Sequence, residues 1–151
     1  MLVVDTPAEM KAHIGQKLGV SDWVTVDQAM IDKFADATGD HHWIHVDVER
    51  AKREMPGGKT IAHGFLTLSL VAGLAHQIYD IRKRSRGINY GSNKVRFTAP
   101  VPVGSRVRLS QTLKNVEAIT GGVRMTFEST MEIEGGARPA LVAETLSLVY
   151  D

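Results

Sequence analysis

The chain has 151 residues, a length that predicts a single domain, residues 1–151, with enough interior to form its own hydrophobic core. It contains no cysteine, which excludes disulfides, thiolate zinc sites and cysteine nucleophiles. The net charge of +1 gives no field that attracts nucleic acid, and no segment resembles a signal peptide or a membrane span, so we expect a soluble cytoplasmic protein without nucleic-acid or membrane partners.

The first forty residues predict two helices separated by a strand. Residues 6–9, Thr-Pro-Ala-Glu, have the spacing of a capping box and predict a helix that ends at Gly15. Residues 20–26 are rich in β-branched side chains and predict a strand. Asp27 can cap a second helix, in which apolar residues recur at helical spacing until Gly39 terminates it.

The middle of the chain predicts a polar loop followed by an apolar helix. Asp40 follows the helix terminator, residues 41–47 are predicted as a loop, and residues 48–53 as a short turn capped by Asp47. The segment 60–80 is the most apolar of the chain and has the length of a helix. Because this helix is apolar on nearly every side, we expect it to be buried on nearly every side.

The remainder of the chain predicts only strands. Alternation of apolar and polar residues, bounded by turns rich in glycine and proline, gives four of them: residues 87–97, 106–118, 123–133 and 141–150. Helices first and an antiparallel meander afterwards define an α+β fold. A sheet curled around one long apolar helix is the hot-dog arrangement.

The loop TGDHHWIHVD holds a candidate acid–base pair. Asp40 and His45 are five residues apart on a predicted loop, where a carboxylate and an imidazole can share one water molecule. On spacing alone, a purely structural hydrogen bond between them is an equal alternative. His41 and His45 have zinc-ligand spacing only on a helix, which Gly39 and Trp43 disfavour, so no metal is expected.

A second candidate lies where the apolar helix begins. The first amides of a helix have no internal acceptor, and Gly64 has no side chain to obstruct them, so its N–H can stabilise negative charge on a carbonyl oxygen. Such a donor near an activated water suits addition of water to an α,β-unsaturated thioester. The basic residues of segment 82–86, with Lys94 and Arg96, can bind coenzyme A phosphates or simply form a solvated surface.

The segment FADATGDHHWIHVDVERA, residues 34–51, resembles the signature of the MaoC-like, (R)-specific enoyl-CoA hydratase family, hydratase 2. Gly39-Asp40 match its Gly-Asp, Ile44-His45 its aliphatic residue and histidine, and Ala51 its last position. The family usually has Asn-Pro where this chain has His42-Trp43. His42 is therefore the candidate replacement for an asparagine that helps to hold substrate or water.

Two further segments resemble the family in the same order. TIAHGFLTLSL, residues 60–70, is similar to the His-Gly entry into the central helix, and INYGSNKVRFTAPVPVGSRV, residues 88–107, is similar to the strand that covers it. The three segments extend from residue 34 to residue 107, about half of the chain. The short nodulation-N-like branch of the family is the most similar.

The resemblance implies a homodimer of hot-dog subunits whose sheets join, with the acyl-CoA tunnel at their interface. It implies that Asp40 and His45 form the catalytic pair, that Gly64 is the oxyanion donor, and that no cofactor acts beyond the coenzyme A of the substrate. Further substrate-binding residues follow from the matched segments: His42, Ile61, Ala62, His63, Gly87, Ile88, Asn89, Tyr90, Thr98, Ala99 and Pro100.

The reaction implied is the interconversion of trans-2-enoyl-CoA and (R)-3-hydroxyacyl-CoA. Two alternatives remain at this point. An acyl-CoA thioesterase on the same fold would also need water and an oxyanion donor, and a non-catalytic acyl-thioester binding module would account for the departure at His42-Trp43. Acyl chain length and the choice between coenzyme A and a carrier protein are not legible in the sequence.

Overall fold

The computed structural model describes every residue from 1 to 151. Its N-terminal residues form β1 (Leu2–Val4), which pairs in parallel with β4 (Tyr79–Ile81), and the sequence predicted neither strand. The predicted strand 20–26 is interrupted. It is replaced by β2 (Lys17–Val20) and β3 (Val24–Thr25), which pair separately with β6 (Arg106–Ile119).

The first predicted helix is a short 3₁₀ helix, Pro7–His13, that ends before Gly15. The predicted capping box does not form, because the Thr6 side chain makes no cap hydrogen bond. Instead the Glu9 carboxylate accepts a hydrogen bond of 2.9 Å from the Asp5 amide. One half of the box, the carboxylate reaching back to the chain before the helix, is therefore present with a shifted donor.

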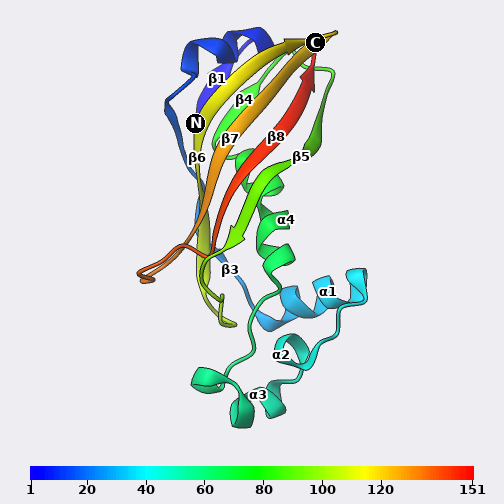
Figure 1. Ribbon diagram of the computed structural model, residues 1–151, viewed down its shortest axis with the longest axis vertical. Coiled ribbons are helices and arrows are strands. Elements are labelled where there is room, and N and C mark those ends of the chain that lie inside the picture. Colours follow the sequence, from blue (N-terminus) through cyan, green and yellow to red (C-terminus); the bar gives the residue numbers. More distant parts are fainter.

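Three short helices gather beyond one end of the sheet (Figure 1). α1 (Gln28–Thr38) confirms the predicted helix: the Asp27 carboxylate accepts from the Met30 amide, and Gly39 ends the helix in the left-handed conformation. The predicted loop 41–47 is wrong in part, because Trp43–Val46 form a single helical turn, α2. The predicted turn is the helix α3 (Val48–Glu54), capped by Asp47 as expected.

The apolar helix, α4 (Gly64–Ala75), is shorter than predicted. Residues 60–62 are extended because tertiary hydrogen bonds hold them: the Ala62 amide donates to the Val101 carbonyl at 2.8 Å, and the Val103 amide donates to the Thr60 carbonyl at 2.9 Å. These bonds override the helical propensity of the segment. They also place the beginning of α4 beside α2.

The main sheet follows the strand order β2-β6-β7-β8-β5, with β3 also on β6. Its long strands are β5 (Arg86–Phe97), β6, β7 (Gly122–Ile133) and β8 (Leu141–Tyr150), all antiparallel to their neighbours. The predicted meander holds for β6, β7 and β8. It is wrong for β5, which pairs with β8 and forms an edge of the sheet.

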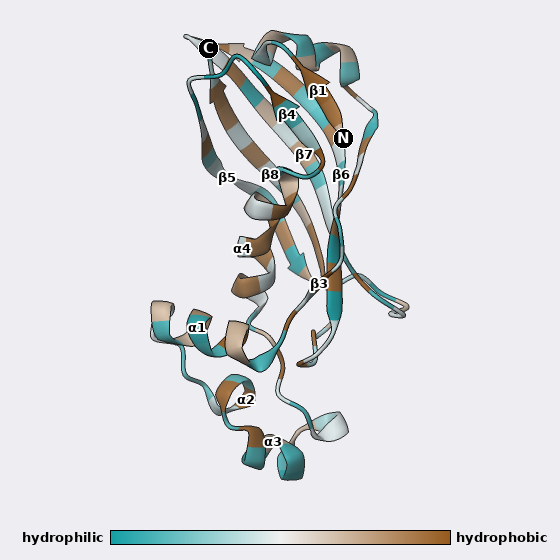
Figure 2. Cartoon of the chain, turned by 180° about the vertical axis from the view of Figure 1, so that it is seen from behind, coloured by the Kyte–Doolittle hydropathy of each residue, from teal (hydrophilic) through white to brown (hydrophobic).

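One core cluster lies between the inner face of the sheet and one side of α4, and a second lies where β1, β4 and the helix Pro7–His13 cover the other end of the sheet. Figure 2 shows brown and teal alternating along the long strands, as expected when one face of a sheet is buried. Only Leu66, Thr67, Val71 and Leu74 of α4 are buried, and Phe65 is 67% exposed. The prediction of burial on nearly every side is therefore wrong for the single chain, because one sheet covers one side of a helix. No helix is long and apolar enough to cross a membrane.

Candidate active site

Asp40 is positioned by the end of α1. Gly39 adopts φ 78°, a left-handed conformation that only glycine reaches without strain, and its amide donates to the Ala35 carbonyl at 2.8 Å. The chain then reverses, so that the Asp40 carboxylate accepts a hydrogen bond of 3.3 Å from the His42 amide, directly before α2. Asp40 is exposed. Its carboxylate is therefore held by local backbone yet open to solvent and ligand.

His45 lies on α2 with 8% of its surface exposed. Its Nδ1 is 2.7 Å from the Ile61 carbonyl oxygen, which can only accept, so Nδ1 carries the proton and Nε2 keeps a free lone pair. Burial lowers the pKa of His45 below its ordinary value of 6.5, outweighing the hydrogen bond to Ile61, which acts in the opposite direction. The imidazole is therefore neutral at neutral pH, the form that can accept a proton.

His63 connects the two residues. Its Nε2 donates to the backbone carbonyl of Asp40 at 2.9 Å, and its ring stacks on the His45 ring with centroids 3.8 Å apart. Phe34 of α1 packs against His63 with centroids 4.9 Å apart. His63 is 3% exposed, and its Nδ1 has no hydrogen-bond partner. One side chain thus fixes both the backbone of Asp40 and the ring plane of His45.

The polar atoms of Asp40, His45 and His63 lie within 4.8 Å of one another, a spacing that could suit a metal ion. The ring geometry disfavours one. Each histidine uses one nitrogen on a carbonyl, and the rings are nearly parallel, 24° apart. Imidazole lone pairs lie in the ring plane, so the remaining lone pairs of these two stacked rings lie in nearly parallel planes. A tetrahedral ion needs ligand directions that converge.

Gly64 and His45 both line one small cavity. Gly64 begins α4, and its amide has no backbone acceptor. It lines a cavity of about 290 Å³ together with His45, Thr67 and Phe97. A Cβ atom at position 64 would lie 3.0 Å from the Phe97 ring, so only glycine fits here without moving that ring. An imidazole lone pair and a free helix amide therefore border one cavity.

The predicted substrate-binding residues divide between two cavities. Ile61, Ala62, Thr98, Ala99 and Pro100 line the cavity of His45 and Gly64. The segment 87–90 lines a larger cavity of about 690 Å³ between β5 and α4. His42 and His63 line neither cavity. His42 precedes the first residue of α2 and donates a hydrogen bond from its amide to the Asp40 carboxylate, whereas the His63 ring stacks on the His45 ring.

Gln28 is part of the site and was missed by the sequence analysis. Its Nε2 donates to the His45 backbone carbonyl at 2.8 Å, and its Oε1 accepts from the Thr60 hydroxyl at 2.6 Å. This side chain joins α1, α2 and the segment before α4. Its partners are 17 and 32 residues away, so no local pattern marks it.

The basic segment 82–86 is largely engaged within the chain. Arg82 and Lys83 approach the Asp5 carboxylate at 3.5 and 3.8 Å, and Arg84 binds the Asp80 carboxylate at 2.6 Å. Lys94 and Arg96, near the end of β5 that carries Phe97, form no ion pair. Arg86, at the beginning of β5, forms no ion pair but lies over the Tyr150 ring at 4.1 Å, so the two cations with neither kind of partner are at the end of β5 nearer to Gly64.

Comparison with known proteins agrees with the resemblance of the motifs. Residues 9–133 match the MaoC like domain family. A 3-hydroxyacyl-thioester dehydratase Z of Mycobacterium tuberculosis is 53% identical over 147 residues, 97% of each chain. A nodulation protein N of Rhizobium leguminosarum bv. viciae is 48% identical over 144 residues, covering 94% of this chain and 89% of the relative.

Solved structures are similar over most of the chain. A monoamine oxidase regulatory protein from Archaeoglobus fulgius superposes with a TM-score of 0.80 at 25% identity, over 100% of this chain and 99% of that one. An (R)-hydratase from A. caviae superposes with a TM-score of 0.71 at 24% identity, over 89% of this chain and 94% of that one. Fold and relatives define an enzyme of the hydratase and dehydratase class with the hot-dog fold. The chain belongs to the MaoC-like domain family.

Proposed function

We propose that this enzyme interconverts trans-2-enoyl-CoA and (R)-3-hydroxyacyl-CoA. The observation that carries the proposal is that His45, neutral and with a free Nε2, and Gly64, whose amide is free, line the same cavity, while polar atoms of Asp40 and His45 lie within 4.8 Å of each other. The dehydratase name of the relative that is 53% identical supports the same reaction type. The chemistry needs no cofactor beyond the coenzyme A of the substrate.

In the proposed mechanism, His45 Nε2 takes a proton from a water molecule while the water oxygen bonds to C3 of the enoyl thioester. The electron pair of the C2–C3 double bond moves towards the thioester carbonyl, whose oxygen gains negative charge. The Gly64 amide stabilises that charge at the positive end of α4. Asp40 takes part in the return of a proton to C2, so that water adds across the double bond on one face.

A hydration assay tests the proposal directly. We expect the protein to consume the enoyl absorbance of crotonyl-CoA without release of free thiol, and the 3-hydroxybutyryl product to be the (R) enantiomer. Enoyl-CoAs of increasing length then define the preferred chain. Release of thiol without hydration would instead identify a thioesterase, and binding of crotonyl-CoA without turnover would identify a binding module.

The acid limb of the pH profile reports on His45. Because burial lowers the pKa of His45, its neutral form persists below pH 6.5 and is lost only as the pH falls through the lowered value. We expect the acid limb of kcat/KM for crotonyl-CoA to be centred below pH 6.5, so that more than half of the value at pH 7.5 remains at pH 6.5. Initial rates at constant ionic strength provide the measurement, and an acid limb centred above 6.5 would be inconsistent with a buried neutral base.

The exposed strand β5 supports a homodimer. It is 12 residues long and hydrogen-bonded to β8 on one side only, and almost all of its residues are exposed, Ile88, Tyr90 and Phe97 among them. A long, unpaired edge strand with exposed apolar side chains is an aggregation hazard unless another chain covers it. Antiparallel pairing of two β5 strands would cover the edge and close the open side of α4.

We expect light scattering after gel filtration to give about 33 kDa, twice the 16.5 kDa of one chain. Proline at Ser92, within β5, removes a backbone donor and is expected to shift the mass towards that of one chain. Ala137→Pro is the control and should leave the mass unchanged, because Ala137 lies exposed in the loop before β8, away from this edge, and its amide donates no backbone hydrogen bond. A wild-type mass of 16.5 kDa would contradict the proposed dimer.

A further inference from the structure

Polar side chains occupy one level of an otherwise apolar inner sheet face. The inward residues of β6 on either side of Gln111 are Leu109 and Leu113, all three of them buried. On β7, Ser129 faces Gln111 across the strands and lies between Phe127 and Met131. On β8 the residue paired with Ser129 is Ala143, so the polar residues continue further along the sheet rather than straight across it. Those that line the large cavity from β8 and β5 are Asn89, Ser92, Thr145 and Ser147.

Gln111 is the most deeply buried of the residues lining the polar side of this cavity. It is 2% exposed, and its Nε2 donates to the Ser129 hydroxyl at 3.0 Å, which in turn lies 3.0 Å from the Thr145 hydroxyl. Its Oε1 has no hydrogen-bond partner. Buried amide oxygens are almost always satisfied in folded proteins, so an unpaired one on a residue that lines a cavity points to a hydrogen-bond donor brought by a ligand.

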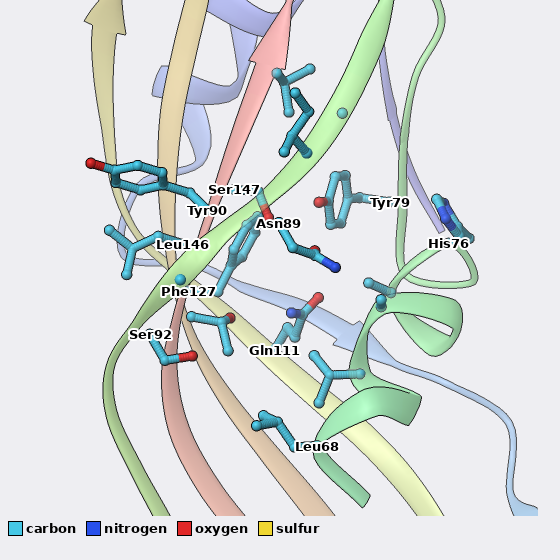
Figure 3. Close-up of a pocket in the computed structure, with 18 of the residues that line it drawn as sticks. Leu68, His76, Tyr79, Asn89, Tyr90, Ser92, Gln111, Phe127, Leu146 and Ser147 are labelled. Carbon is cyan, nitrogen blue, oxygen red and sulfur yellow. The ribbon is translucent and has the colours of Figure 1, made fainter. Parts of the chain in front are cut away.

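The large cavity lies further along α4 than the first one. The first borders Gly64 and Thr67 of that helix, whereas the second borders its later residues from Leu68 onwards. Figure 3 shows the Gln111 and Asn89 side chains directed into the space in front of α4. Ala72, beside this space, is eight residues beyond Gly64, which corresponds to about 12 Å along the helix axis.

Charge indicates which end of a thioester substrate occupies the large cavity. Arg84 is the arginine that lines it, and its guanidinium is already bound to Asp80 and to the Ile81 carbonyl. Arg86, at the same end of β5, has no ion pair either, but its guanidinium lies over the Tyr150 ring, 4.1 Å from the ring centroid. Two further cations without ion pairs, Lys94 and Arg96, lie together towards the opposite end of β5. Phosphates of coenzyme A are attracted to that end. The acyl chain, on the other side of the thioester carbonyl, then runs into the large cavity.

We propose that the large cavity holds the outer part of the acyl chain and that Gln111 accepts a hydrogen bond from a hydroxyl group on it. The preferred substrates are then hydroxylated acyl thioesters, with apolar side chains such as Val71 and Phe127 contacting the hydrocarbon between the two ends. This inference rests on the proposed function for the placement of the thioester at Gly64. A hydroxyl group both donates and accepts, so it satisfies either orientation of the Gln111 amide.

The test uses saturated ligands that cannot react. Binding of decanoyl-CoA and of hydroxydecanoyl-CoAs, with the hydroxyl moved along the outer half of the chain, is measured by calorimetry on the full protein. We expect at least one hydroxylated ligand to bind wild type on the order of 10-fold more tightly than decanoyl-CoA. Gln111→Leu should remove or reverse this preference, and Gln111→Met serves if the leucine variant does not fold.

Thr112→Val is the matched control, because Thr112 follows Gln111 on β6 but faces the other side of the sheet, and it should keep the wild-type preference. Equal binding of all ligands by wild type, an unchanged preference in the Gln111 variants, or no binding at all would overturn the inference. Hydration of crotonyl-CoA by the wild-type protein tests the proposed function separately, because the short acyl chain of crotonyl-CoA ends before the large cavity. A preference for hydroxylated ligands without hydration would refute the reaction and leave the recognition by Gln111 standing.

Discussion

Asp40→Asn and His45→Gln are each expected to lower kcat for crotonyl-CoA hydration by on the order of 100-fold or more. The asparagine keeps an acceptor for the His42 amide but cannot take up a proton. The glutamine removes the lone pair at Nε2 that faces the cavity, while its amide can still bind the Ile61 carbonyl. Steady-state kinetics with matched melting temperatures give the measurement.

His41→Gln is the matched control for both substitutions. His41 lies between the two residues in the chain, is exposed, and binds Asp36 at 2.9 Å on the outer side of α1. Its substitution should leave kcat and KM within about twofold of wild type, because surface changes away from a site perturb little. Near-native turnover by either Asp40→Asn or His45→Gln would end the assignment of that residue.

Gly64→Ala is expected to lower kcat/KM by roughly 100-fold, the loss typical of one oxyanion donor. The added methyl group would lie 3.0 Å from the Phe97 ring, so either the ring or the beginning of α4 must shift, and the amide leaves its place beside the cavity. The readout is kcat/KM for crotonyl-CoA. Phe97→Leu, introduced together with Gly64→Ala, should recover part of the loss because it removes the ring.

Gly73→Ala separates this effect from a general effect on the helix. Gly73 lies in the same helix, and a Cβ atom there would meet nothing within 4 Å. Alanine at this position should raise the free energy of unfolding by about 0.5–1 kcal/mol and leave catalysis unchanged. If Gly64→Ala also retained wild-type kcat/KM, the proposed oxyanion role of its amide would be wrong.

Elements with strong local signals were predictable from the sequence. The cap at Asp27 and the terminator at Gly39 bound α1, and the alternating segment 141–150 is β8. The beginning of α4 was not, because the hydrogen bond from Ala62 to Val101 holds an apolar segment extended. The position of β5 at the sheet edge was also not predictable, since strand order depends on pairing rather than on local pattern.

The candidate site was predictable only where a motif marked it. Asp40, His45 and Gly64 stand at motif positions, and in the structure His45 and Gly64 line one small cavity while Asp40 lies within 4.8 Å of His45. The stacking of His63 on His45 depends on the approach of two segments that the sequence does not relate. Gln111 did carry a signal, a polar residue at an inward position of an alternating strand, but its meaning requires the cavity beside it.

The contacts of residues 60–62 also bear on when activity arises during synthesis. Both His45 and Asp40 leave the ribosome early, yet the Ile61 carbonyl that sets the His45 tautomer is held by a bridge to Pro102 and by neighbouring bonds to Val101 and Val103. A nascent chain that ends before residue 101 contains Asp40, His45 and Gly64 but lacks the segment 101–103 that holds residues 60–62 in place. Competence for chemistry therefore waits for the second half of the polypeptide.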